Sequence, residues 1–290
     1  MFILALDPGH GINTAGKRCD KCIDPNETRE WVLNSRICNY IESYLKDYTG
    51  YSLFRVDDIT GKNDIALPTR VKMANDKGAS FYLSVHANAG INGGSGGGIM
   101  SFSYNNSKTE SPEWRDELYD ALIKHTGLKG DRSDPTTTAN FYVLRNTKMP
   151  AVLLELGYMD SKTDVPVILT EDFAKKCAKA IVEVIVRRGN LKKKATTTTT
   201  STTNTNTPGA TISSAPYRVQ VGAYKNKANA INLQVELKKL GYSTIIKSEK
   251  DAKGVTLYKV QVGAYKNKAN AIKTQVALKS LGYNSIIKVW

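Results

Sequence analysis

Two of the three histidines in the sequence come directly after segments that read as buried strands. His10 follows the apolar run 2–6 within the motif DPGHG, and His86 follows the run 81–85 within SVHANA. Both should lie at the carboxyl end of a strand, the edge where sites gather in α/β sheets. A catalytic zinc ion usually takes three protein ligands and leaves one position for water. The two histidines therefore predict a metal centre that needs a third ligand.

The third ligand is expected among the acidic residues that precede or begin the first predicted helix. Asp24, Glu27 and Glu30 all lie in this region, and their spacing alone leaves the choice between them open. A further acid, Glu155, follows the apolar run in PAVLLELG. Burying a carboxylate without a partner costs free energy. Glu155 is therefore expected either in the site or in a salt bridge at the end of its strand.

The remaining histidine and the four cysteines do not extend this site. His125, in LIKHTG, is typical of the last turn of a helix, where a positive charge is favourable. Cys19 and Cys22 form a single C-x-x-C pair, and Cys38 and Cys177 do not supply the second pair that a zinc ribbon needs. We expect free thiols, with a local disulfide or a second metal site as the alternatives.

Residues 1–191 alternate between strand-like and helical segments and are expected to form a catalytic domain. The strands are predicted at 2–6, 52–56, 81–85, 99–104 and 151–156, and the helices at 30–47, 67–77, 111–126 and 171–188. Alternation of this kind predicts an α/β fold with a mixed, twisted sheet flanked by helices.

Two further segments follow this domain. Residues 192–216 begin with three lysines and continue with threonine, serine and asparagine, which cannot build a core, so they are predicted to be a linker. In residues 217–290, the stretch YRVQVGAYKNKANAI recurs as YKVQVGAYKNKANAI. Each copy reads as a strand, a helix that ends at LGY and a second strand. Two such halves predict one small, ferredoxin-like βαββαβ domain.

The net charge of +14 lies outside the first domain. Residues 1–190 hold 24 basic and 24 acidic residues, residues 191–216 add three lysines, and residues 217–290 hold 14 basic and 3 acidic residues. This distribution excludes a uniformly basic protein that coats a polyanion. No stretch approaches the roughly 20 apolar residues of a membrane-spanning helix.

Taken together, four segments resemble those of zinc-dependent N-acetylmuramoyl-L-alanine amidases of the Amidase_3 type. They are DPGHG, EWVLN, SVHANA and PAVLLELG, in this order within residues 1–190. The resemblance implies that His10, Glu30 and His86 hold zinc and that Glu155 is the catalytic glutamate. It also implies the substrate, which is the amide between muramic acid and L-alanine in peptidoglycan.

In such an enzyme, zinc would lower the pKa of a water molecule and polarise the amide carbonyl. Glu155 would take the proton of the water and return it to the leaving amine. Asn88 and Arg70 are weaker candidates for substrate binding. A turn-forming asparagine and an ion-pairing arginine are the alternatives at these two positions.

The repeated C-terminal segment resembles a SPOR domain in its two VQVGAY strands and its two LGY turns, across nearly all of residues 217–290. The resemblance implies binding to the glycan strands of peptidoglycan, particularly those without stem peptides. Strand alternation should bury the valines under the helices and leave polar residues on the open face of the sheet. The candidate glycan-binding residues are Arg218, Gln220, Tyr224, Lys259, Gln261 and Tyr265.

The charge of this domain also suits teichoic acids or other anionic polymers of the wall. Nucleic acid is the rival partner, because RNA-recognition modules also have a four-stranded sheet with aromatic residues. Those modules carry their aromatic residues in the centre of the sheet, where this sequence has VQVG. We therefore expect no nucleic-acid partner.

These observations predict a peptidoglycan-cleaving zinc amidase that a SPOR domain holds on the cell wall. A zinc peptidase that cuts within the stem peptide and a wall-binding protein with a vestigial site are the alternatives. The first residues, MFILALD, lack the basic region and the apolar length of a secretory signal. We expect synthesis in a reducing cytoplasm and action on the wall after holin- or lysis-mediated release, as for a phage endolysin or the autolysin of a sporulating cell.

Overall fold

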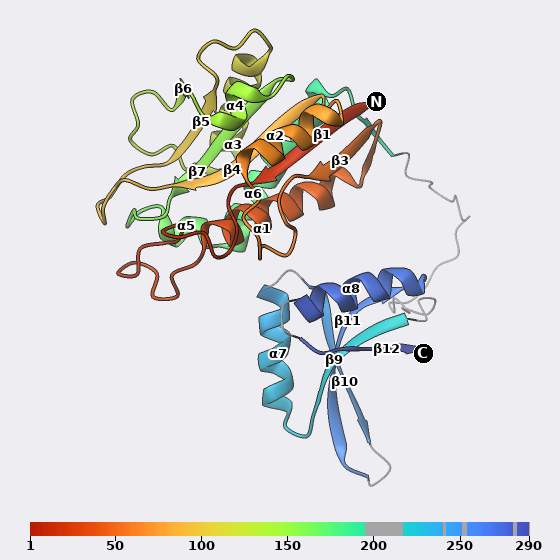
Figure 1. The fold of residues 1–290 in the computed structure, drawn as a ribbon. Helices are drawn as coiled ribbons and strands as arrows, with labels where there is room; N and C mark the ends of the chain where they lie inside the picture. The colour runs from red at the N-terminus through yellow and green to blue at the C-terminus, as the bar shows by residue number, and fades with distance from the viewer. Residues whose placement is uncertain (195–216, 240–241, 251–253, 281–282, 290) are drawn as a thin grey trace, which may run out of the picture. The chain divides into compact units, whose positions relative to one another are not determined.

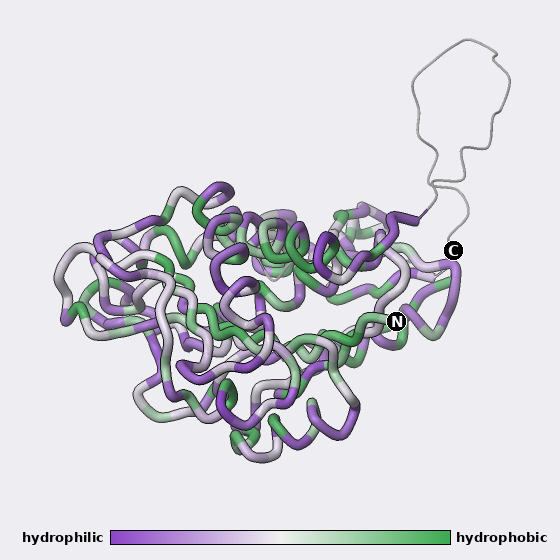
Figure 2. The backbone as a smooth tube through the Cα atoms, turned by 90° about the horizontal axis from the view of Figure 1, so that it is seen from above, coloured by the Kyte–Doolittle hydropathy of each residue, from purple (hydrophilic) through white to green (hydrophobic). Residues whose placement is uncertain are grey.

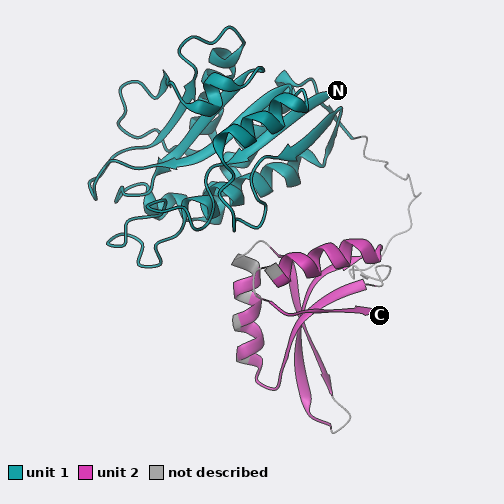
Figure 3. Cartoon of the chain, in the orientation of Figure 1, with its two compact units in different colours: residues 1–198 teal, residues 199–290 magenta. Residues whose placement is uncertain are grey.

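The computed structural model describes residues 1–194, 217–239, 242–250, 254–280 and 283–289. The chain divides into two compact units, residues 1–198 and 199–290, and each is described by itself (Figure 3). The predicted linker needs one correction, because β8 (Lys192–Lys193) pairs with β2 (Tyr48–Thr49) of the first unit. A two-residue backbone ladder needs no apolar side chain, so a run of lysines gave no sign of it. The rest of the predicted linker, 195–216, lies outside the described residues.

The first unit is built on a six-stranded sheet with the order β3-β1-β4-β7-β5-β6 (Figure 1). Strands β3, β1, β4 and β7 are parallel, β5 runs antiparallel to β7, and β6 runs parallel to β5. This confirms the predicted mixed α/β sheet. The strands are β1 (Phe2–Pro8), β3 (Tyr51–Arg55), β4 (Phe81–Asn88), β5 (Ile99–Ser103), β6 (Thr136–Thr138) and β7 (Ala151–Tyr158).

Helices cover both faces of this sheet because its central strands are apolar on both sides. Along β1, Leu4 and Leu6 point into one core and Ala5 into the other, and all three are fully buried. Figure 2 shows this hydrophobic segment starting at the N-terminus. Among the described residues, no helix has both the length and the apolar character needed to cross a membrane. One face carries α1 (Glu30–Leu45), α3 (Ser111–Thr126), α5 (Val165–Ile168) and α6 (Glu171–Arg188), and the other carries α2 (Leu67–Asp76) and α4 (Tyr142–Asn146).

The parallel strands bring three carboxyl ends together at one edge of the sheet. The register pairs Pro8 of β1 with Val85 of β4, and His86 of β4 with Glu155 of β7. Side chains at or just after these strand ends are therefore neighbours, although they are far apart in the sequence. The elements that the sequence did not predict, β2, β6, α4, α5 and β8, span two to five residues each, too few to show a period.

The second unit has the predicted βαββαβ order and a four-stranded antiparallel sheet arranged as β10-β11-β9-β12. Its core contains Val219, Val260 and Val262 from the sheet and Leu237 and Leu278 from the helices. It is built from β9 (Tyr217–Tyr224), α7 (Lys227–Lys239), β10 (Thr244–Lys250), β11 (Thr256–Tyr265), α8 (Lys268–Ser280) and β12 (Ile286–Val289).

Because each unit has its own sheet and its own buried core, we predict that each folds without the other. Residues 1–194 and 217–290, produced separately, should each unfold cooperatively. Calorimetry of the full chain should then show two transitions with the midpoints of the separate pieces. A single transition in the full chain, or an unfolded 1–194 piece, would contradict this prediction.

Candidate active site

Glu30 occupies the first position of α1 and is buried between the two predicted histidines. Its Oε1 lies 3.0 Å from His86 Nδ1 and accepts a hydrogen bond from the backbone N–H of Ala87 at 3.2 Å. Its Oε2 lies 3.3 Å from His10 Nε2. One ligand atom from each of these three side chains falls within 4.8 Å of the others. Two imidazoles and a carboxylate form one of the ligand sets of catalytic zinc sites.

The two competing acids of the same region are engaged elsewhere. Asp24 accepts hydrogen bonds from the backbone N–H groups of Asn26 and Thr28 and so closes a turn of the loop. Glu27 forms an ion pair with Arg18, with 3.1 Å between its Oε1 and the arginine Nε. Of the three acids that the spacing left open, the structure therefore brings only Glu30 to the histidines.

The backbone around His10 is shaped for this arrangement. His10 has a φ of +67°, in the left-handed region that non-glycine residues rarely adopt. A β-carbon on Gly9 would overlap the ring of His86, so a larger residue here would push that ring out of place. Asn34, one turn into α1, donates hydrogen bonds to the carbonyl oxygen of Gly9 and to Glu30 Oε1, both at 3.4 Å. With these contacts, the imidazole rings of His10 and His86 lie edge to face.

The charges of Glu30 and His10, and the atoms that they leave without a hydrogen bond, fit a divalent metal ion. Burial alone would raise the pKa of Glu30, but the hydrogen bond and charge of His86 hold it below its ordinary value. Burial lowers the pKa of His10 to about 4, so its ring is neutral at pH 7. His10 Nε2 and Glu30 Oε2 are buried and have no hydrogen-bond partner among the described residues. A neutral imidazole nitrogen and an ionised carboxylate oxygen that face each other unpartnered are suited to a shared cation.

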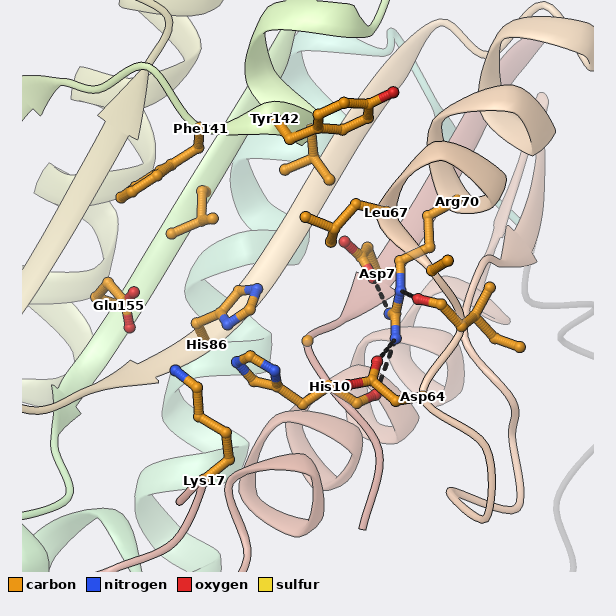
Figure 4. A pocket seen from close by; sticks show the side chains of 15 residues that line it. Asp7, His10, Lys17, Asp64, Leu67, Arg70, His86, Phe141, Tyr142 and Glu155 are labelled. Carbon is orange, nitrogen blue, oxygen red and sulfur yellow. Dashed lines mark hydrogen bonds and ion pairs between the residues drawn. The ribbon is translucent and has the colours of Figure 1, made fainter. Parts of the chain in front are cut away.

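Glu155 lies beside this group, on the strand next to His86. Burial raises its pKa to about 7, although the nearby charge of His86 acts in the opposite direction. Its Oε2 is buried and has no hydrogen-bond partner in the described part of the chain. Figure 4 shows the carboxylate pointing into the cavity beside the two rings. A carboxyl group with a pKa near neutrality can accept and return a proton.

The site opens into a cavity of about 520 Å³. One wall is polar and carries the histidines and Glu155, with Lys17 and Asp64 nearby (Figure 4). The opposite wall is apolar, and its members come from α2, from α4 with the residue before it, and from β7. They are Leu67, Phe141, Tyr142, Val143 and Leu153. None of these wall residues was a candidate from the sequence, because an apolar residue that lines a cavity carries no motif, and Lys17 and Asp64 lie in irregular segments.

Arg70 lines the cavity, but its role differs from the predicted substrate binding. The side chain is buried, and its five N–H groups donate hydrogen bonds to Asp7 Oδ1, Asp64 Oδ1 and the carbonyl oxygens of Ile65, Pro8 and His10. A guanidinium group has five N–H donors, so none is left for a substrate. Arg70 is a positioning residue that fixes the backbone on both sides of His10.

Asn88 is engaged within its own turn. Its Oδ1 accepts a hydrogen bond from the backbone N–H of Ala89 at 2.8 Å, and its carbonyl oxygen accepts one from Met159. It is absent from the cavity wall. The geometry thus favours the turn-forming alternative over the predicted contact with substrate.

The remaining histidine and the cysteines behave as expected. His125 lies in the last turn of α3, and its Nε2 is 2.9 Å from Glu183 Oε2. All four cysteines are free thiols. Cys19 is buried, and burial raises the pKa of its thiol to about 12, whereas Cys22 is exposed.

In the second unit, three of the predicted glycan-binding residues gather on the sheet face opposite the helices. Gln220 and Gln261 are paired in register across β9 and β11, and Arg218 is two residues along the same strand. Both side-chain amide atoms of Gln261, Oε1 of Gln220 and Nε of Arg218 are buried without a hydrogen-bond partner among the described residues. Lys259, by contrast, is paired with Glu249, whose Oε2 lies 2.6 Å from its Nζ.

The two tyrosines of that set lie on the other side of the sheet. Tyr224 and Tyr265 pack against the hydrophobic core beneath the helices, and the Tyr265 hydroxyl lies 2.8 Å from Thr274 Oγ1 of α8. Strict alternation from Gln261 would put Tyr265 on the open face. The ladder between β9 and β11 is shifted in register at two places, and Gly263 has a φ of +62°. Each β-bulge adds one residue and so reverses the facing of the side chains that follow.

Comparisons with known proteins agree with this geometry. Residues 4–187 match the family model of N-acetylmuramoyl-L-alanine amidase, Amidase_3, and residues 213–288 match the SPOR domain. The sporulation-specific N-acetylmuramoyl-L-alanine amidase of Bacillus subtilis is 31% identical over 247 residues, which cover 85% of this chain and 84% of that protein. The amidase CwlM of Bacillus licheniformis is 29% identical over 248 residues, or 85% of each chain. The solved structure of the catalytic domain of the amidase CwlV from Bacillus (Paenibacillus) polymyxa aligns with a TM-score of 0.58 at 26% identity, over 66% of this chain and all of that domain.

These matches decide between the alternatives that the sequence left open. The first unit has the fold of the amidases, and the relatives match across both units rather than over the wall-binding part alone. This favours an amidase over a stem-peptide peptidase and over a vestigial site. The chain therefore belongs to the Amidase_3 family of N-acetylmuramoyl-L-alanine amidases, and it joins this peptidoglycan-hydrolysing unit to a C-terminal SPOR domain.

Proposed function

We propose that this amidase is a zinc enzyme in which His10, Glu30 and His86 hold the metal and Glu155 moves the proton. The observation that carries the proposal is the buried Glu30 carboxylate between two imidazoles, with two facing atoms left unpartnered. Zinc, when bound, supplies a Lewis acid that makes water a stronger nucleophile and an amide carbonyl a better electrophile. The protein supplies orientation, through Arg70, Asn34 and the Gly9 turn.

Glu155 suits the proton transfer because its carboxyl group is close to the balance between its ionised and protonated forms at neutral pH. As the ionised group it accepts a proton from the attacking water, and as the acid it returns that proton to the amine of L-alanine as the C–N bond breaks. A pKa near 7 makes both steps accessible at neutral pH. The apolar wall that includes Leu67 and Phe141 faces this group and would seat the methyl groups of the lactyl and alanyl parts of the substrate.

We further propose that the second unit binds glycan strands through the sheet face that carries Arg218, Gln220 and Gln261. Support comes from their buried, unpartnered amide and guanidinium atoms, since such atoms lower the free energy of a complex when a ligand hydrogen-bonds to them. Sugar hydroxyls can both donate to and accept from glutamine amides. The positive charge of residues 217–290 adds a sequence-independent attraction to anionic wall polymers.

For the place of action, we propose the wall of the cell that makes the protein, reached when that cell lyses. One relative is named a sporulation-specific amidase, which favours the autolysin over the endolysin of the two expected roles. Fractionation of a sporulating culture would find the protein inside the mother cell before lysis. Its recovery from the medium of intact cells would contradict this.

The proposed reaction predicts which products form, and it predicts that the rate falls when one carboxylate oxygen of Glu155 is replaced. Zinc-loaded protein acting on purified peptidoglycan should release stem peptides with a free N-terminal L-alanine, which mass spectrometry detects. Glu155→Gln should lower the rate by at least about 10²-fold because the amide cannot take the water proton, while the zinc content stays at that of the wild type. New termini within the stem peptide, or a Glu155→Gln variant as fast as the wild type, would refute the assignment.

The buried position of Glu155 also predicts a pH-dependent cost in stability. The pKa of Glu155 is about 7 in the metal-free folded state and 4.5 in the absence of the fold. Between pH 4.5 and pH 7, Glu155 is therefore protonated in the folded state and ionised in the unfolded chain. Stability should therefore fall as pH rises from about 4.5 to 7, by up to roughly 3 kcal/mol. Glu155→Gln removes this cost.

Urea unfolding in EDTA measures this effect. Glu155→Gln should gain stability over the wild type at pH 8 and lose most of that gain at pH 4.5. Asp120→Asn, at an exposed position in the middle of α3, serves as the control and should show no such change with pH. An equal difference between Glu155→Gln and wild type at both pH values would contradict a raised pKa.

The wall-binding proposal predicts which substitutions weaken binding. In a Glu155→Gln background, Gln261→Leu should weaken binding of the full chain to purified sacculi about tenfold, the loss expected for a hydrogen bond of roughly 1.4 kcal/mol. Lys273→Met, on an exposed position of α8, should weaken it less than Lys259→Met on the sheet, although both remove one charge. Equal losses for the two lysines and none for Gln261→Leu would mean that charge alone binds the wall.

A further inference from the structure

The loop between β1 and α1 holds Lys17 directly over the buried Glu30. The carbonyl oxygen of Lys17 accepts a hydrogen bond from the Glu30 backbone N–H at 3.1 Å, and the N–H of Cys19 donates to the carbonyl oxygen of Thr28 at 2.9 Å. The same turn therefore begins the helix and fixes the backbone of Lys17. The position of Lys17 is therefore set by α1, the helix that carries Glu30.

The side chain of Lys17 ends at the site itself. Its Nζ lies 3.8 Å from Glu30 Oε2, and it lines the cavity together with Glu155 and the two histidines. Figure 4 shows the ammonium group pointing toward the imidazole rings. The side chain is 44% exposed, so it reaches the carboxylate from the open side of the cavity.

The other nitrogen donors that line the cavity are already committed. All five N–H groups of Arg70 bond to Asp7, Asp64 and backbone carbonyls. His10 and His86 are the proposed metal ligands, and their ring nitrogens lie 3.3 and 3.0 Å from Glu30, whereas Lys17 Nζ, at 3.8 Å, is beyond hydrogen-bond distance. Among the described residues of the cavity wall, Lys17 is therefore the cation whose N–H groups are open to a substrate.

We propose that Lys17 is a catalytic residue that donates a hydrogen bond to the oxyanion formed during amide hydrolysis. The inference rests on the proposed function. As the water oxygen bonds to the carbonyl carbon, the C=O π electrons move onto the carbonyl oxygen and the water proton passes to Glu155. When the C–N bond breaks, that proton goes to the amine. Lys17 keeps all its protons throughout and stabilises the negative charge while it exists.

A hydrogen-bond donor beside the carbonyl oxygen stabilises the negative charge that develops there, and this stabilisation is much larger in a partly dehydrated site than in water. Removal of one such donor costs about 10²–10³ in kcat in well-studied hydrolases. Recognition of a carboxylate in the stem peptide is the competing role for a cavity lysine. That role would act on substrate binding and so on KM, because the same contact would exist before and during the reaction.

Steady-state kinetics of the zinc-loaded full chain on a soluble muramyl peptide separate these roles. Lys17→Met should lower kcat by about 10²–10³ and change KM by less than about threefold, and Lys17→Arg should recover part of the loss. Lys21→Met, an exposed position in the same loop, should behave as the wild type. A rise in KM at an unchanged kcat, or a Lys17→Met variant with wild-type kinetics, would overturn the inference.

Two binding measurements give a readout that does not depend on turnover. A muramyl peptide analogue with a phosphinate in place of the scissile amide mimics the tetrahedral oxyanion, and its affinity for Lys17→Met should fall by the same factor as kcat. Calorimetric titration of zinc into metal-free Lys17→Met should give an affinity at least equal to that of the wild type, because a cation beside Glu30 has been removed. Weaker zinc binding would assign Lys17 a structural role instead.

Failure of the inference is distinguishable from failure of the proposed function. If the wild type releases no N-terminal L-alanine, or if Glu155→Gln retains the wild-type rate, the proposed function fails whatever Lys17 does. If those results hold and Lys17→Met is fully active, the inference alone fails.

Discussion

The buried carboxylate of Glu30 is the constraint on which the rest of the site depends. A negative charge out of water is stable only with partners, and here His10, His86, the Ala87 N–H and Lys17 converge on it. Two of its contacts, from His86 and from the Ala87 N–H, come from β4, which is far from it in sequence. Its Oε2 accepts no hydrogen bond among the described residues and faces the imidazole of His10 at 3.3 Å, which suits this carboxylate to a shared metal ion.

Two features of the fold bring the other site residues to Glu30 and hold them there. The parallel order of β1, β4 and β7 brings His10, His86 and Glu155 to one edge of the sheet. Arg70 then locks the chain after β1 by bonding to the carbonyls of Pro8 and His10 and to Asp7, itself bound by Tyr82 and Ser84. A substitution at Arg70 of α2, which is far from His10 in the sequence, should therefore alter the backbone at His10.

The sequence predicted what periodicity and motifs encode, and missed what depends on irregular backbone. The α/β sheet and the βαββαβ unit were evident because they rest on regular strands and helices. His10, His86 and Glu155 were candidates because each lies at or just after the end of a predicted strand. The family resemblance pointed to Glu30, but spacing alone left Asp24 and Glu27 beside it, and it left both roles open for Arg70. The structure separates these alternatives because burial and donor counts are not visible in spacing. Tyr224 and Tyr265 were misplaced because β-bulges reverse side-chain facing without changing the pattern of residue types.

The central claim, that Glu30 and the two histidines form a zinc site, has a direct spectroscopic test. The zinc K-edge absorption spectrum of the full chain with one equivalent of zinc reports the ligand atoms and their distances. We predict nitrogen and oxygen ligands at about 2.0–2.2 Å and no sulfur. Scattering from sulfur at about 2.3 Å, which would place the ion on the thiols of Cys19 and Cys22, would contradict the account.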